Sequence, residues 1–141
     1  MRLKLALVLV GALSFTLAPV LATAMTEDEQ LCNNANANDD AHALDAHCPI
    51  AAAQQQDLST MSSDPNEAQN AQLREGGYLF LAAKGALLTM QLQLGAAELS
   101  KALSVFKDVR DHGVTKELRT RAMTGIQMVE DTVSRLSHLS P

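Results

Sequence analysis

The sequence YLFLAAKGALLTMQLQL fills residues 78–94 and is apolar on nearly every side of a helix. Such a helix needs neighbours all around it, so we predict a buried central helix that ends at Gly95. Its 17 residues lie near the lower limit for crossing a bilayer. Lys84 in the middle, with Gln91 and Gln93 near the end, argues against a membrane span.

The first 24 residues have the pattern of a secretory signal peptide. A basic start, Met1 to Lys4, precedes an apolar run over residues 5–20, and the small residues Ala22 and Ala24 fit a cleavage site. We therefore predict a signal peptide over residues 1–24 and an exported mature chain, periplasmic in a bacterium and otherwise secreted. No stable membrane insertion is expected after cleavage.

Helix signals fill the mature chain, residues 25–141. Thr26 and Glu29 form a capping box, and Asp64-Pro65 marks another helix start. A mature length of 117 residues suits one domain. We therefore predict an all-α fold: a small helical bundle of about five or six helices around the central helix. Residues 25–64 would form its acidic, disulfide-linked N-terminal part, and residues 65–141 its core helices.

Two helices are expected after Gly95. The first has an apolar stripe that ends at His112-Gly113, and Glu98 is predicted on another, polar face of it. Thr115 is expected to cap the last helix. Its apolar seam has near-heptad spacing and contains Leu118, Ala122, Ile126, Val129, Val133 and Leu136.

Cys32 and Cys48 predict an intrachain disulfide, because an even number of thiols in an exported chain most often pairs. On one continuous helix they would lie about 24 Å apart, far beyond the roughly 4.4–6.8 Å that a disulfide allows between Cα atoms. The chain must therefore fold back, and the polar residues 38–40 are the expected break. We predict a second short helix that ends before Pro49 and a third that begins there.

Charge is divided unevenly along the chain. Residues 25–73 hold nine acidic residues and no Lys or Arg, whereas residues 74–141 hold nine basic and seven acidic residues. The mature chain has 11 − 2 = 9 basic and 16 acidic residues, a net charge of −7, which makes nucleic acid an unsuitable partner. The acidic segment must face water, the basic half of the chain or a cationic partner.

One cluster is rich in possible metal ligands, but its spacing is poor. His42 and His47 are five residues apart, which turns them away from each other on a helix, and a disulfide would remove both sulfurs. We predict no metal and no cofactor, and the chain shows none of the common nucleophile or phosphate-loop motifs. The other members of this cluster are Asp39, Asp40, Asp45, Cys48 and Cys32.

Lys84 and Arg74 are the predicted contacts for a partner or an anion. Lys84 either extends its stem along apolar surface to reach water, or pairs with an acid from residues 25–73. The main functional hypothesis is a non-catalytic exported protein-binding module, such as an inhibitor or immunity protein, an accessory subunit or a chaperone-like protein. The alternative is a small all-helical enzyme that binds an anionic substrate through Arg74 and Lys84, helped by Arg119 or Arg121.

Overall fold

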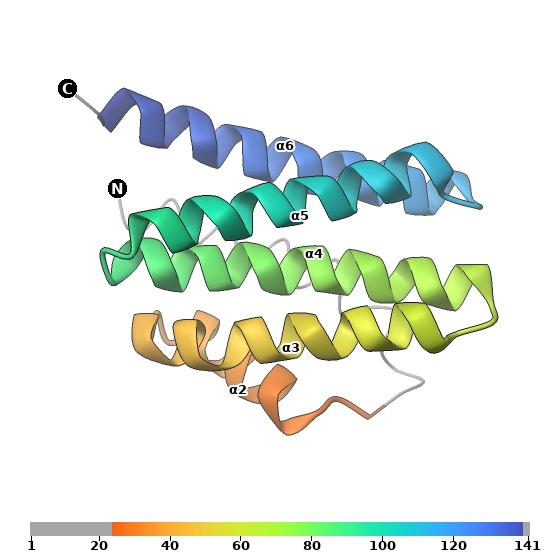
Figure 1. The fold of residues 1–141 in the computed structure, drawn as a ribbon, viewed down its shortest axis with the longest axis horizontal. Coiled ribbons are helices and arrows are strands. Elements are labelled where there is room, and N and C mark those ends of the chain that lie inside the picture. Colours follow the sequence, from red (N-terminus) through yellow and green to blue (C-terminus); the bar gives the residue numbers. More distant parts are fainter. Residues whose placement is uncertain (1–23, 140–141) are drawn as a thin grey trace.

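The computed structural model describes residues 24–139, and five helices run through this part of the chain. The last four are long and alternate in direction, so each packs antiparallel to the next (Figure 1). Helix α2 is short and lies against α3. The helices are α2 (Glu27–Ala37), α3 (Ala41–Met61), α4 (Pro65–Leu88), α5 (Leu92–His112) and α6 (Lys116–Leu139).

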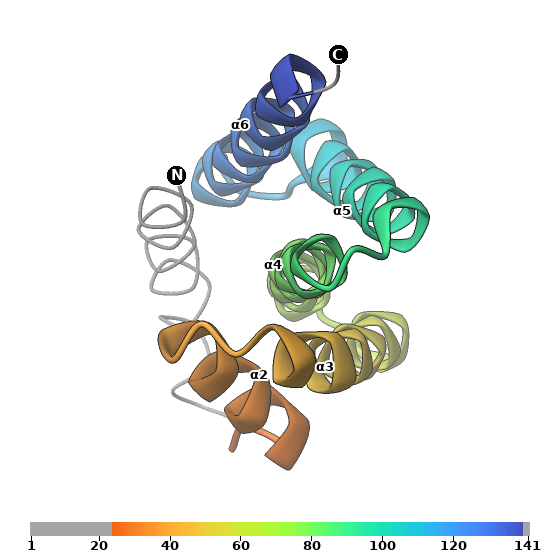
Figure 2. The ribbon, with the colours of Figure 1, turned by 90° about the vertical axis from the view of Figure 1, so that its left-hand side faces the viewer.

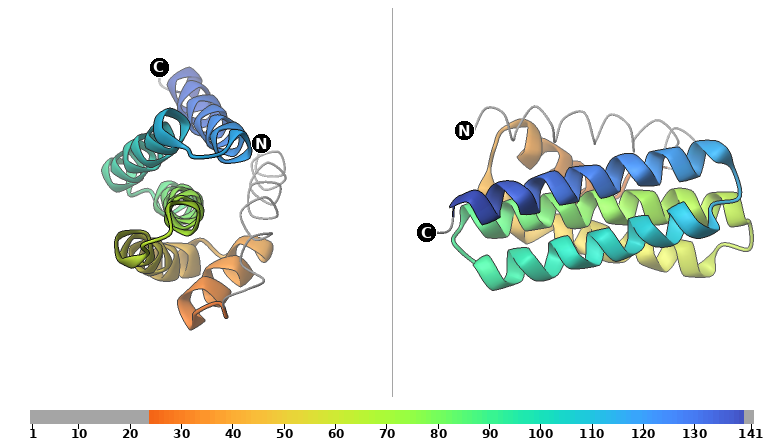
Figure 3. Two further views of the ribbon diagram at one scale, coloured as in Figure 1. Left: turned by 90° about the vertical axis from the view of Figure 1, so that its right-hand side faces the viewer. Right: turned by 90° about the horizontal axis from the view of Figure 1, so that it is seen from above.

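Seen end-on, the helices follow a curved row in chain order, with α4 in the middle (Figures 2 and 3). Helix α4 packs against α3 on one side and α5 on the other, while α2 and α6 lie beyond these two. Nearly all of α4 from Ala71 to Ala86 is buried. The predicted all-α bundle around a buried central helix is therefore confirmed. The predicted signal peptide falls almost entirely outside the described residues.

The start of the row follows the sequence signals closely. The Thr26 hydroxyl accepts a bond from the Glu29 amide, and the Glu29 carboxylate accepts one from the Thr26 amide, which completes the predicted capping box. Helix α2 ends at Ala37, so the predicted break over residues 38–40 is confirmed. The chain turns back there, and Cys32 and Cys48 form the predicted disulfide with their Cα atoms 4.9 Å apart.

The predicted helix boundary at Pro49 is wrong, because α3 runs unbroken from Ala41 to Met61 with Pro49 inside it. Proline removes one helical hydrogen bond and usually kinks or ends a helix. Here the buried face of α3 continues across the proline, from Leu44 through Cys48 to Ala51 and Gln55. Packing of this face on α4, together with the disulfide at Cys48, stabilises the helix despite the local penalty.

The predicted end of the central helix at Gly95 is also wrong. Helix α4 ends at Leu88, and the Gln91 amide donates to the Ala86 carbonyl in a Schellman-type turn that places Met90 at φ 65°. Gly95 instead lies inside α5. A Cβ there would lie 2.7 Å from Cγ of Leu87, so this glycine permits close packing of α5 on α4.

Phe106 of α5 holds three helices in register. Gly76 of α4 and Gly125 of α6 both lie against its ring, since a Cβ added at either would come within 2.6 Å of a ring carbon. Helix α4 continues through Gly76 and Gly77 without a break, although glycine lowers helix propensity. The absence of a side chain at Gly76 and Gly125 lets the Phe106 ring pack closely against α4 and α6.

The last two helices carry the expected apolar faces. Helix α5 ends at His112, and the Thr115 hydroxyl accepts a bond from the Leu118 amide at the start of α6. The seam of α6 is buried as far as Val129, but Val133 is exposed. Figures 1 and 3 show why: the C-terminal half of α6 diverges from α5.

Candidate functional site

An acidic layer covers the outer side of α2, α3 and the start of α4. Its seven carboxylates are exposed or half-buried, and no Lys or Arg occurs between residues 25 and 73. Among the described residues, no ion pair joins one of them to a lysine or arginine. The acidic layer consists of Glu27, Asp28, Asp40, Asp45, Asp57, Asp64 and Glu67.

Three large apolar side chains are exposed on α3 among these acids. Ile50, Leu58 and Met61 lie along the helix, and Met61 is 81% exposed at its end. Asp57 is exposed beside Leu58 in the chain. The acidic layer therefore combines negative charge with exposed apolar side chains.

Beneath this layer, a buried polar network ties α2 to α3 and α4. The Glu29 carboxylate accepts bonds from Gln55 Nε2 at 2.7 Å and from the Tyr78 hydroxyl at 3.2 Å. Arg74 Nε donates to Gln55 Oε1 at 2.7 Å. Arg74 thus acts within the bundle, next to a carboxylate that balances its charge.

Burial sets the titration of this network. Desolvation lowers the pKa of Arg74, and the negative charge of Glu29 opposes that shift. The pKa of the Tyr78 phenol is raised, first by burial and then by the negative charge of Glu29. Arg74 therefore stays charged and Tyr78 stays neutral at physiological pH, which keeps the donors and acceptors of the network fixed.

Lys84 is buried and paired. Its Nζ lies 2.6 Å from Oδ1 of Asp39, in the turn between α2 and α3, and 3.3 Å from Oδ1 of Asn36, in the last turn of α2. Of the two predictions for this residue, pairing with an acid of residues 25–73 is confirmed. The pair joins the central helix to the acidic N-terminal part.

The other arginines of the enzyme hypothesis lie on α6. Arg121 is buried, burial lowers its pKa, and its Nη1 donates to Asn70 of α4 at 2.8 Å. Arg119 is exposed, and its Nη1 donates to the Gly113 carbonyl at 2.6 Å in the turn before α6. Arg74 lies close enough to Arg121 for its charge to contribute to lowering the pKa of Arg121.

The residues weighed as metal ligands do not converge on a metal site within the described residues. Cys32 and Cys48 form the disulfide, and His47 Nδ1 lies 3.2 Å from Asp28 Oδ1. Within residues 24–139, no three His, Cys, Asp or Glu side chains form a metal-binding group.

Glu98 is a site residue that the sequence reading missed. It was expected on a polar face of α5, but it is only 6% exposed, and its Oε2 accepts no hydrogen bond from the described residues. The signal was available in its spacing: Glu98 lies three residues after Gly95 and four before Ala102, both on the buried face of α5.

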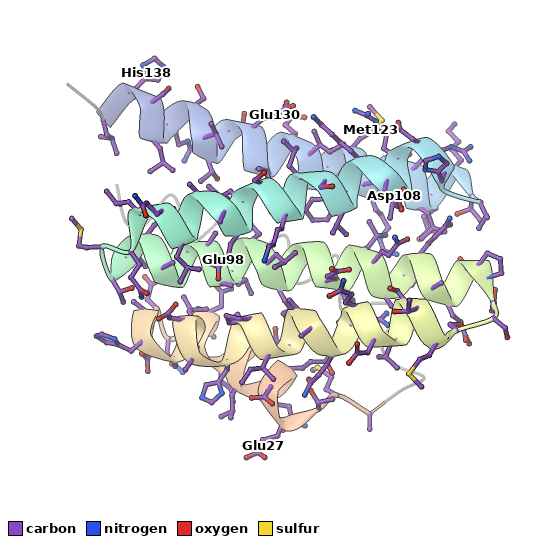
Figure 4. The ribbon with its side chains drawn as sticks, in the orientation of Figure 1. Glu27, Glu98, Asp108, Met123, Glu130 and His138 are labelled. Carbon is purple, nitrogen blue, oxygen red and sulfur yellow. A yellow bond between two sulfur atoms is a disulfide. The ribbon has the colours of Figure 1, made fainter. Side chains whose placement is uncertain are left out.

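A shallow depression of about 250 Å³ lies between α5 and α6 and is open to solvent. Figure 4 shows Met123 and Glu130, two of its lining residues, on the outer side of α6. None of the predicted contacts, Arg74 and Lys84 included, lines it.

Comparisons with protein-family models, with curated proteins and with solved structures find no match to this chain. In residues 24–139, each helix is too short or too polar to cross a membrane.

Proposed function

We propose that this chain is an exported helical binding module whose acidic layer engages a cationic protein. The observation that carries the proposal is the run of seven acidic-layer carboxylates with no Lys or Arg paired to them among the described residues. The two other acids of this part, Glu29 and Asp39, already have partners on α4. The chain thus pairs these two acids with α4 and leaves the acidic layer without a Lys or Arg partner among the described residues.

A partner that fits this surface carries Lys or Arg around an apolar centre. Ile50 and Leu58 would supply the apolar contact, and Asp57 and Glu67 the charged surroundings. Charge complementarity mainly speeds encounter and selects the partner, so association should weaken as salt is raised.

The test is affinity capture from the compartment in which the protein resides, followed by binding measurements with the recovered partner. Glu27→Gln/Asp57→Asn should lower the association rate several-fold at low salt. The matched control Glu130→Gln/Asp131→Asn removes the same charge from exposed positions on α6 and should bind as the unmodified protein does. Equal effects of both variants, or binding that is insensitive to salt, would rule out the acidic layer as the contact surface.

Export is a separate part of the proposal. It is supported by the signal-peptide pattern of residues 1–24 and by the disulfide, which oxidising compartments favour. Mass spectrometry of the protein isolated from its host should give a chain that begins at Met25. A chain that retains Met1 would contradict cleavage.

The small-enzyme alternative has weaker support. Arg74 and Lys84 would have to bind an anionic substrate, yet Arg74 donates to Gln55 and Lys84 bonds Asp39 and Asn36. A substrate would need to replace bonds that already satisfy these cations. The binding module is therefore the function that we favour.

A further inference from the structure

Glu98 lies on the buried face of α5, near the part of α4 that packs closely against both α5 and α3. One turn before it, Gly95 allows α5 to pack against Leu87 of α4. On the other side of α4, a Cβ added at Gly85 would lie 2.6 Å from the backbone nitrogen of Asp45, so α3 is equally close there. Figure 4 shows Glu98 extending from α5 over α4.

The surroundings of Glu98 disfavour a charged carboxylate. The side chain is buried, and its Oε2 lacks a hydrogen-bond donor among the described residues. From α3, the Asp45 carboxylate adds a like charge, and Gln91 holds that carboxylate in place with a 2.8 Å bond to Oδ2. Lys101, one turn further along α5, is the opposing positive charge. No charged group of α4 is among the charges that act on Glu98.

We propose that Glu98 is a proton-binding site through which mild acid strengthens the packing of α5 on α4. When protonated, the side chain is neutral, and its burial costs much less lost hydration than burial of the charged carboxylate. Burial first, and then Asp45, raises the pKa of Glu98 from 4.5 to about 7, while Lys101 lowers it.

The sign of the effect follows from linkage. A carboxyl whose pKa is higher in the folded than in the unfolded state contributes stability that is fully present below the unfolded pKa. That stability is lost as the pH rises through the folded pKa. Here it is present below pH 4.5 and lost as the pH rises through about 7. Acidification from about pH 7.5 to 5.5 should therefore lower the unfolding equilibrium constant on the order of ten-fold.

The experiment measures urea unfolding of the full chain at pH values between 5.5 and 8, for the unmodified protein and for two variants. Glu98→Gln keeps the size of the side chain without its charge, so the ten-fold change with pH should largely disappear. Glu130→Gln removes an exposed carboxylate from α6, and this variant should keep the ten-fold change of the unfolding equilibrium constant with pH. Glu75, also buried with a raised pKa, is unchanged in both variants and contributes equally.

A second measurement stands even when Glu98→Gln does not fold. Carbon-13 NMR of the unmodified protein should show the Glu98 carboxyl titrating near pH 7, and Asp45→Asn should move that midpoint downward. A Glu98 midpoint near the ordinary 4.5, or a pH dependence of unfolding that Glu98→Gln leaves intact, would overturn the proposal.

Discussion

At the scale of single residues, Lys84 is the clearest case of a charge placed by the fold. The turn between α2 and α3 sets Asp39 at φ 56°, with the Asp40 amide bonded to the Ala35 carbonyl. Asp and Asn tolerate this left-handed conformation better than most residues. The turn thereby brings the Asp39 carboxylate to the buried amine of Lys84, whose charge would otherwise be costly to bury.

Removing that carboxylate charge should destabilise the protein. We expect Asp39→Asn to lower the free energy of unfolding by about 1–3 kcal/mol, below the roughly 3–5 kcal/mol for a fully buried pair because half of the Asp39 side chain is exposed. Asparagine keeps the backbone conformation, so the change isolates the charge. Chemical denaturation measures the effect, with exposed Asp57→Asn as the control, expected within about 0.5 kcal/mol of the unmodified protein.

Met90 adopts the same left-handed conformation, but no ion pair like that of Asp39 stabilises it. It lies at φ 65° in the α4–α5 turn and is 77% exposed, so its side chain gains little from packing. Met90→Gly should raise the free energy of unfolding by about 0.5–1 kcal/mol, because glycine escapes the Cβ clash. Met61→Gly, an equally exposed position with helical backbone, should lower it instead; the same sign for both would contradict this account.

Two residues show how far the sequence predicts the site. The chain segment that pairs with Lys84 was predicted, because residues 25–73 hold acids without cations. The burial of Glu98 was not predicted, because its carboxylate favours a polar face and only its spacing from Gly95 and Ala102 indicates otherwise. Tertiary packing, rather than the charge of the side chain, decides whether such a residue is buried.

At the scale of helices, the contact of Phe106 with two glycines sets how α4, α5 and α6 pack. Gly76→Ala would improve helix propensity by about 1 kcal/mol, yet its Cβ would lie 2.6 Å from the ring. Overpacking of this kind typically costs about 1–3 kcal/mol. We therefore expect Gly76→Ala to lower the thermal unfolding midpoint.

A double variant separates the clash from other effects of the alanine. Phe106→Leu alone should destabilise the bundle, since a smaller side chain leaves space between Gly76 and Gly125. In the double variant the added methyl should fill part of that space. The loss of stability in the double variant should therefore be smaller than the sum of the losses in the two single variants. Strict additivity would show that the methyl and the ring do not meet.

Helix ends explain which elements the sequence could predict. The starts at Thr26, Asp64 and Thr115 depend on side chains that bond nearby amides, and the structure shows each of these caps. The errors at Pro49 and Gly95 arose from residues whose local preference was overruled by contacts with α4. The face of α3 around Pro49 packs on a helix that follows it in the chain, and Gly95 meets Leu87 only because the chain reverses at Met90. Local patterns reveal neither contact.

At the scale of the whole molecule, charge is separated across the curved row of helices. The acidic layer lies on α2, α3 and the start of α4, whereas the Lys and Arg side chains within residues 24–139 all lie from Arg74 onward. Two ion pairs among the described residues involve a lysine or an arginine. Only Lys84 with Asp39 joins the acidic part to the basic part, because Arg110 pairs with its neighbour Asp111. Repulsion within the acidic layer is thus largely uncompensated in the isolated protein.

This separation predicts that salt stabilises the free protein. Raising ionic strength from about 10 mM to about 0.1 M shortens the Debye length from about 30 to about 10 Å, which screens repulsion among exposed carboxylates more than the buried Lys84–Asp39 pair. The free energy of unfolding should rise by up to about 1 kcal/mol, measured by urea denaturation in sodium chloride.

Two double variants test whether the acidic layer causes this gain in stability. Glu27→Gln/Asp57→Asn should reduce the gain, and Glu130→Gln/Asp131→Asn should leave it unchanged. A free energy of unfolding that falls with salt would mean that attraction between the acidic layer and the basic helices outweighs repulsion within the acidic layer. The acidic layer would then lack the unbalanced charge that a cationic partner requires.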